Sequence, residues 1–167
     1  IRDISTHELI WEFGRILEKE KNREDSITYW CYKNKIPMVI PGPLDGSWGW
    51  QIYYFWQDGH KDFNVNIMKD EDLLSDFIYS ADKTGAFMIG GGISKHHTIW
   101  WNQFRGGLDY AIYITTAPEW DGSLSGARIR EAISWGKVKE DADFITIEGD
   151  ATVILPIMIA SLFESLK

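Results

Sequence analysis

The sequence predicts an α/β fold in which helices cover both faces of a mainly parallel, doubly wound sheet. Short apolar runs, typical of buried strands, alternate with segments whose apolar residues recur at helical spacing. Glycine-bearing or polar loops follow several of these runs. We predict strands over 36–41, 86–89, 110–115 and 144–148. In such Rossmann-like sheets, ligands bind beyond the carboxyl ends of the strands.

The segments between and around these strands are expected to be helices. The first, over 6–21, begins with a capping box in which Ser5 and Glu8 satisfy free backbone N–H groups. The second starts at Asp25 or Ser26. Further helices are expected over 48–56, 70–79, 95–104, 127–135 and 151–163, and we expect the last, which is almost wholly apolar, to be buried.

Composition restricts the class of protein. The chain has 167 residues, 44% apolar and 14% aromatic, so we expect 1–167 to form a single α/β region with a core. A formal charge of −8 argues against nucleic acid and anionic membranes as partners. The single cysteine, Cys31, excludes an internal disulfide and fits a reducing, cytoplasmic location. The apolar run 151–163 is too short to span a bilayer and contains Pro156.

The segment from Asp121 to Lys137 is the first candidate for chemistry. A polar loop, Asp121–Gly126, precedes a predicted helix that Gly136 ends, and Lys137 follows directly. A lysine amine kept partly dry beside Trp135 can attack a carbonyl or imine carbon. The alternative is that Lys137 is an ordinary basic residue at a helix C-terminus.

A triple-glycine turn, Gly90–Gly92, joins a predicted strand to a helix and leaves room for phosphate at the helix N-terminus. It is not a full dinucleotide fingerprint, because Lys95 replaces the third glycine. His96 and His97 point about 100° apart on a helix and cannot easily share a metal. One of them is either a hydrogen-bonding group in the ligand-binding cleft or a histidine whose hydrogen bonds are purely structural. Both alternatives stay open. We expect no metal site, since zinc-ligand spacing is absent from the sequence.

Two aspartates are placed at the ends of predicted strands. Asp45 follows the run 36–41 and is either a ligand contact or a turn residue before Gly46. Asp150 follows the run 144–148, where an acid can hold a ribose hydroxyl or cap the next helix.

Taken together in order, these motifs closely resemble the deoxyhypusine synthase family. The resemblance covers roughly 27–162 and is densest over 85–151. Its segments are 45–47, 90–97, 107–111, 116–117, 121–127, 131–137 and 150–151.

The resemblance implies a reaction. NAD-dependent oxidation of spermidine gives an imine, and the aminobutyl group passes to an enzyme lysine, then to a lysine of the hypusine-containing translation factor. It implies that Lys137 is the enzyme lysine. His96, Gly122, Ser123, Glu131 and Trp135 would line the amine pocket, with His96 moving protons. Asp45, Gly91, Thr116, Ala117, Asp150 and Ala151 would contact NAD.

The sequence departs from the family pattern at two positions. Trp50 and Leu124 stand where many eukaryotic members carry acids, which removes negative charge from the amine pocket. A homospermidine synthase-like polyamine aminobutyltransferase therefore stays open, as does a non-catalytic, NAD-binding regulatory paralogue, although Lys137 counts against the latter. Family members are much longer and form tetramers. We accordingly expect 1–167 to be the C-terminal half of a longer NAD-binding and catalytic domain that needs the N-terminal half.

Overall fold

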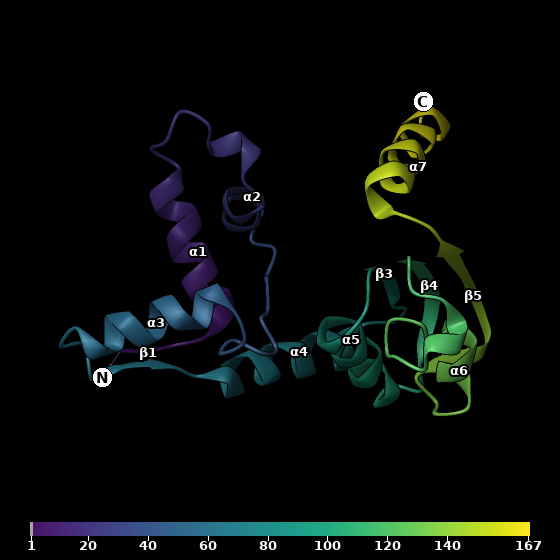
Figure 1. Cartoon of the computed structure of the whole chain (residues 1–167), viewed down its shortest axis with the longest axis horizontal. Helices are drawn as coiled ribbons and strands as arrows, with labels where there is room; N and C mark the ends of the chain where they lie inside the picture. Colours follow the sequence, from purple (N-terminus) through teal and green to yellow (C-terminus); the bar gives the residue numbers. More distant parts are fainter. Residues whose placement is uncertain (1) are drawn as a thin grey trace. The chain divides into compact units, whose positions relative to one another are not determined.

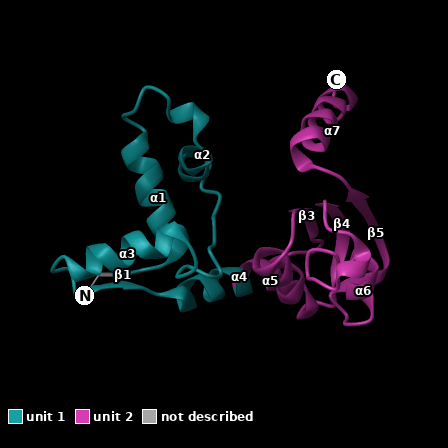
Figure 2. Cartoon of the chain, viewed as in Figure 1, with its two compact units in different colours: residues 1–75 teal, residues 76–167 magenta. Residues whose placement is uncertain are grey.

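The computed structural model describes residues 2–167 (Figure 1). The chain divides into two compact units, the first ending at Ser75 and the second running from Asp76 to Lys167 (Figure 2). The helix α4, Ile67–Ser80, contains the boundary. The predicted α/β class is confirmed, because all the paired strands of the described residues are parallel and helices flank them.

The first unit contains a two-stranded parallel sheet and three further helices. Strand β1, Arg2–Ile4, pairs with β2, Phe63–Val65. Neither strand is among those that the sequence predicts. The helices are α1, α2 and α3, over Thr6–Leu17, Ile27–Asn34 and Ser47–Gln57, with a short 3₁₀ turn, η1, over Arg23–Asp25.

The start of α1 is held as the sequence predicts. Ser5 Oγ accepts a hydrogen bond from the Glu8 N–H at 3.1 Å, and Glu8 accepts one from the Ser5 N–H at 2.8 Å. Asp70 of α4 adds to this cap by accepting hydrogen bonds from the backbone N–H groups of Thr6 and His7. Asp70 is only 2% exposed, so α1 and α4 are joined by a buried polar contact.

The predicted strand over 36–41 is wrong. Residues 36–40 have no regular secondary structure. Pro37 and Pro41 lack the N–H groups that a central strand donates. The segment instead makes isolated contacts: the Ile40 N–H donates to Thr6 Oγ1 at 3.0 Å, and the Ile36 carbonyl accepts from the Trp11 indole at 3.0 Å.

The second unit is built on a parallel sheet of order β3–β4–β5. The strands are Gly85–Ile89, Leu108–Thr115 and Val138–Glu148. Helix α5, Ile93–Gln103, connects the first two strands, and a loop containing the turn η2, Glu119–Asp121, and the helix α6, Ile129–Ile133, connects the others. The predicted strands 86–89, 110–115 and 144–148 are confirmed, while α6 is shorter than the predicted helix over 127–135.

The inner face of this sheet carries the core. Buried side chains from all three strands and from α6 pack together, with Ile99 of α5 partly buried against them. The buried members are Ala86, Met88, Leu108, Ala111, Tyr113, Ile129, Ala132 and Val138.

The outer face is also apolar. Strand register places Phe87, Ile112 and Ile145 in one row. Phe87 is 47% exposed and Ile145 is 53% exposed. Parallel sheets are normally covered on both faces.

A partly buried ion network supports the amino end of β4. Asp109 accepts hydrogen bonds from Arg105 at 2.9 Å, Lys139 at 2.5 Å and the Thr84 N–H at 2.9 Å. These donors, Lys139 foremost, hold the pKa of Asp109 well below its usual range.

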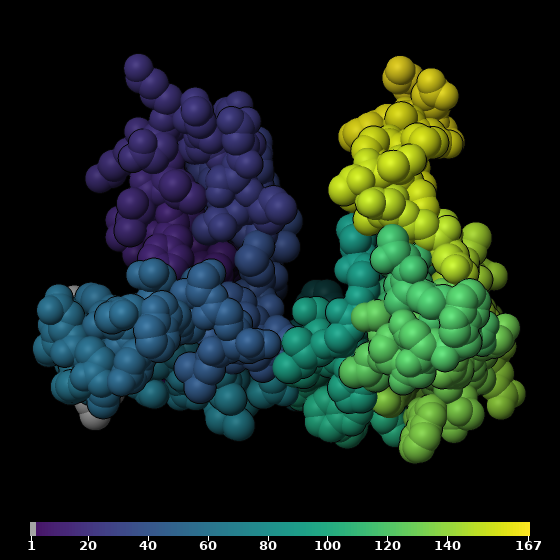
Figure 3. All heavy atoms as spheres, in the orientation of Figure 1, coloured from purple at the N-terminus to yellow at the C-terminus, as the bar shows by residue number. Residues whose placement is uncertain are grey.

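The final helix, α7, covers Ala151–Ser165 and contains no buried residue. It projects from the body of the second unit (Figure 3). The expectation that this segment is buried is therefore wrong for the described chain, because no element covers it: Val153, Ile157 and Phe163 are each more than 60% exposed. Within residues 2–167, no helix has the length and apolar character needed to cross a membrane.

Candidate functional site

Four of the predicted site residues line one cavity in the second unit. His96 comes from α5, Glu131 from α6, and Trp135 and Lys137 from the turn between α6 and β5. The cavity has a volume of about 150 Å³. Its other walls are Met88, Lys95, Ile99, Leu124, Ala127, Arg128, Ile129, Ala132 and Val138.

The backbone at Lys137 is fixed on both sides. Gly136 adopts a left-handed conformation (φ 65°), and the Lys137 N–H donates to the Ala132 carbonyl at 3.0 Å. The Lys137 carbonyl accepts from the Leu108 N–H at 3.0 Å. Glycine tolerates this φ without strain, so it closes the turn that connects α6 to β5.

The side chain of Lys137 is half-buried, and its Nζ lies 5.9 Å from the centre of the Trp135 ring. That ring is 68% exposed, so in the described chain it forms an open side of the cavity. Glu131 is also exposed, and its Oε1 accepts from the Arg128 N–H at 3.2 Å. A carboxylate, an aromatic face and an amine thus share one small opening.

Lys95 is the buried lysine of this cavity, and sequence reasoning missed it. It is 7% exposed, and its ammonium donates to the carbonyls of Leu124 and Ala127. Burial lowers the pKa of Lys95 to about 8, while the negative charge of Glu131 opposes that shift. In the sequence, Lys95 stands only as the residue that interrupts a glycine fingerprint. The signal that could have found it is its position on the first turn of a predicted helix, directly after a triple-glycine turn.

The loop Asp121–Ala127, hereafter the serine loop, is tied to itself. Asp121 Oδ1 accepts from the N–H and the hydroxyl of Ser123 at 2.8 and 2.7 Å. These bonds hold the pKa of Asp121 below its ordinary value. The predicted substrate residues Gly122 and Ser123 are exposed on this loop and are not among the residues that line the cavity.

The serine loop is also tied to the sheet. The Ser125 carbonyl accepts from the Tyr113 hydroxyl at 2.6 Å and from Thr115 Oγ1 at 3.0 Å. Gly91 packs against the same residue, since a Cβ on Gly91 would lie 2.4 Å from Ser125 Cα. Gly91 is therefore a packing contact for the loop, whatever else it binds.

The predicted cofactor residues of the second unit gather at the carboxyl ends of the strands. Gly91 follows β3, Thr116 and Ala117 follow β4, and Asp150 and Ala151 follow β5. Parallel pairing brings these ends to one edge of the sheet. Asp45, the remaining predicted cofactor contact, belongs to the first unit and lies in the loop before α3.

This edge has features that suit a nucleotide. Gly90 and Gly92 have positive φ values, and an added Cβ on either would meet nothing within 4 Å, so backbone is open to a ligand there. Asp150 also caps α7, because its Oδ1 accepts from the Thr152 N–H at 2.8 Å and the Thr152 hydroxyl at 2.7 Å. The residues present therefore fit a dinucleotide. Only Oδ2 of Asp150 would be available to it, because Oδ1 accepts the two hydrogen bonds from Thr152.

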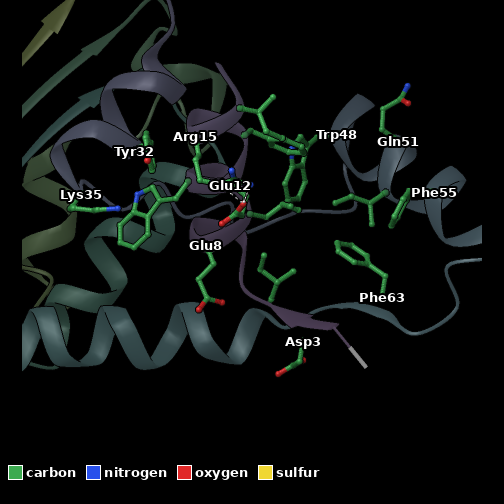
Figure 4. A pocket seen from close by; sticks show the side chains of 16 residues that line it. Asp3, Glu8, Glu12, Arg15, Tyr32, Lys35, Trp48, Gln51, Phe55 and Phe63 are labelled. Carbon is green, nitrogen blue, oxygen red and sulfur yellow. Dashed lines mark hydrogen bonds and ion pairs between the residues drawn. The ribbon is translucent and has the colours of Figure 1, made fainter. Parts of the chain in front are cut away.

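A larger cavity, of about 1130 Å³, lies in the first unit (Figure 4). Six of its sixteen lining residues are aromatic, including Trp11, Trp48 and Phe55. It contains none of the predicted site residues, and its acids already have partners: Glu12 pairs with Arg15, and Glu8 caps α1. We therefore place the candidate site in the second unit. Among residues 2–167, no group of three metal-ligating side chains could hold a metal ion.

Comparison with known proteins agrees with the resemblance seen in the motifs. The family model described as deoxyhypusine synthase matches residues 1–162. A probable deoxyhypusine synthase of Picrophilus torridus is 60% identical over 159 residues, which are 95% of this chain and 50% of the relative. That of Thermoplasma volcanium is 57% identical with the same coverage. That of Sulfolobus acidocaldarius is 55% identical over 98% of this chain and 50% of the relative.

The chain spans about half the length of the curated relatives it matches. The family model nevertheless covers the cavity, the serine loop and the carboxyl edge of the sheet. The chain belongs to the deoxyhypusine synthase family.

Proposed function

We propose that this chain is the lysine-bearing half of an NAD-dependent deoxyhypusine synthase. The complete enzyme would transfer the aminobutyl group of spermidine, through an imine on Lys137, to a lysine of the hypusine-containing translation factor. The observation that carries this proposal is that Lys137, His96 and Glu131 meet at one cavity within a chain of this family.

The cavity residues suit imine exchange. The neutral amine of Lys137 would attack the imine carbon of oxidised spermidine, and the remaining diamine would leave. His96 is within the same cavity and would move the protons that this exchange requires near neutral pH. Glu131 and the face of Trp135 would hold the protonated end of the amine, by charge and by cation–π attraction. Gly122 and Ser123 would contact the substrate from the serine loop.

Bound NAD would supply the hydride acceptor for spermidine oxidation and the hydride donor for the final reduction. Gly91, Thr116, Ala117, Asp150 and Ala151 would hold it at the carboxyl edge of the sheet, together with Asp45. This assignment is supported by the open glycine backbone at Gly90 and Gly92.

The proposed enzyme includes a complementary half. The exposed apolar outer face of the β3–β4–β5 sheet and the uncovered helix α7 both need a partner surface. The half length relative to the curated relatives supports the same idea. We propose that the N-terminal half of the family domain supplies this surface, in a cytoplasmic homo-oligomer such as a tetramer.

One observation favours a second candidate, a homospermidine synthase-like polyamine aminobutyltransferase. Leu124, which stands where many eukaryotic family members carry an acid, lines the cavity beside Lys137 and is 52% exposed. An apolar wall there reduces the attraction for a second ammonium group. The acceptor would then be a free amine.

Product analysis separates the two. The complete assembly is incubated with NAD, spermidine labelled in its aminobutyl group, and the translation factor. Label on the factor supports deoxyhypusine synthase, and label that appears only in new small amines, distinct from the spermidine supplied, supports the second candidate. A folded, complete assembly that transfers no label to either acceptor would contradict both.

A further inference from the structure

We propose that Lys95 is a positioning residue whose ammonium clamps the serine loop and so sets the shape of the Lys137 cavity. The catalytic part of this inference rests on the proposed function, while the clamp itself does not.

The contacts of Lys95 define its role. Its Nζ lies 2.8 Å from the Leu124 carbonyl oxygen, 2.5 Å from the Ala127 carbonyl oxygen and 3.9 Å from the centre of the Tyr113 ring. Two acceptors and an aromatic face therefore surround the ammonium. An amine held this way is not free to attack a carbon, in contrast to Lys137.

The two carbonyls bracket the middle of the serine loop. Between them lie Ser125, which the sheet holds through Tyr113 and Thr115, and Gly126. Lys95 thus fixes the loop on both sides of its contact with the sheet. A buried ammonium is costly unless such acceptors satisfy it, so charge and loop conformation depend on each other.

The clamp acts on the cavity because its two anchor points are also cavity walls. Leu124, Ala127 and Lys95 itself all line the cavity that contains Lys137. If the carbonyls lose the ammonium, these walls can move relative to Lys137. Reacting groups tolerate little displacement, so we expect the loss in the chemical step rather than in folding.

Hydrogen–deuterium exchange of the complete assembly tests the clamp without reference to activity. In Lys95→Met we expect the Gly126 and Ala127 amides to exchange about tenfold faster, the effect of losing one charged hydrogen bond. Amides of β4 should keep their protection. Lys95→Arg, which keeps the charge and can reach two acceptors, should restore most of it. Unchanged loop exchange in a folded Lys95→Met protein would overturn the clamp.

Kinetics on the same variants test the catalytic part. We expect Lys95→Met to lower kcat about tenfold or more with a smaller change in the KM for the amine, and Lys95→Arg to recover part of kcat. A loosened loop with unchanged kcat would overturn the positioning role. If wild type transfers no aminobutyl group but the exchange pattern holds, the proposed function fails and the clamp stands. Should Lys95→Met not fold, Lys95→Gln, which keeps a donor for one carbonyl, is measured by the same two assays and judged by the same outcomes.

Discussion

Gly91→Ala distinguishes a cofactor contact from a packing contact. The new Cβ would lie 2.4 Å from both Cα and Oγ of Ser125, whereas ordinary contacts begin near 3.4 Å. The serine loop must therefore move by about 1 Å, which would stretch the 2.6 Å bond from the Tyr113 hydroxyl to the Ser125 carbonyl past its useful range. Overpacking costs about 1–3 kcal/mol and a lost hydrogen bond about 1 kcal/mol, so we expect a destabilisation of about 2–4 kcal/mol.

The assay is urea denaturation in the absence of NAD. Unfolding is monitored through the fluorescence of a probe in the second unit, and the free energy of unfolding is compared between variants. Gly90→Ala is the matched control. It lies in the same turn and has a positive φ of 72°, but its Cβ would meet nothing within 4 Å. The control should show only backbone strain of about 1 kcal/mol.

The reasoning about Gly91 fails if Gly91→Ala is as stable as wild type without NAD and shows only a weaker affinity for NAD. That result would make Gly91 a cofactor contact with no packing role. A destabilisation equal to that of Gly90→Ala would also refute it, because the steric contact would then contribute nothing.

Further predictions concern charge, capping and specificity. The folded pKa of Lys95, about 8, lies below its unfolded value, so the unfolded chain binds more protons between pH 8 and 10.5. Stability of wild type relative to Lys95→Met should therefore rise from pH 7 to pH 9, by about 1 kcal/mol after allowance for water in the cavity, and a flat or falling difference in thermal denaturation would contradict this. Asp109 has a depressed pKa, so its contribution is present above the unfolded pKa of about 4 and is lost as the pH falls. The melting temperature of Asp109→Asn should therefore be lower than that of wild type at pH 7, and this difference should disappear in strong acid. Asp150→Ala removes the cap from α7, and amide exchange at Thr152 should rise while that of β4 does not. Leu124→Asp should lower the KM for spermidine more than for a monoamine, whereas an equal effect on both amines would show that Leu124 does not face the second ammonium group.

The sequence predicts local features of both units well. The Ser5 cap and the strands of the β3–β4–β5 sheet depend on short-range rules and on hydrophobic pattern. The run 36–41 is apolar enough for a strand, but its prolines leave it without the necessary donors. Helix α7 shows a different problem: its apolar pattern predicts burial, whereas the helix has no buried residue within the described chain.

The candidate site divides in the same way. The motif around Lys137 could be found from the sequence, because a glycine-ended helix followed by a lysine is a local pattern. The role of Lys95 could not, because it depends on two carbonyls that lie 29 and 32 residues further along the chain. Every residue type supplies a backbone carbonyl, so a sequence motif cannot identify which carbonyls will accept a hydrogen bond.

Reductive trapping tests directly whether Lys137 carries the aminobutyl group. The complete assembly is incubated with NAD and spermidine, reduced with borohydride and digested, and the modified lysine is located by mass spectrometry. We expect an aminobutyl adduct on Lys137 in the wild type and none in Lys137→Ala. An adduct on another lysine, or label transfer to the acceptor that survives in Lys137→Ala, would contradict it.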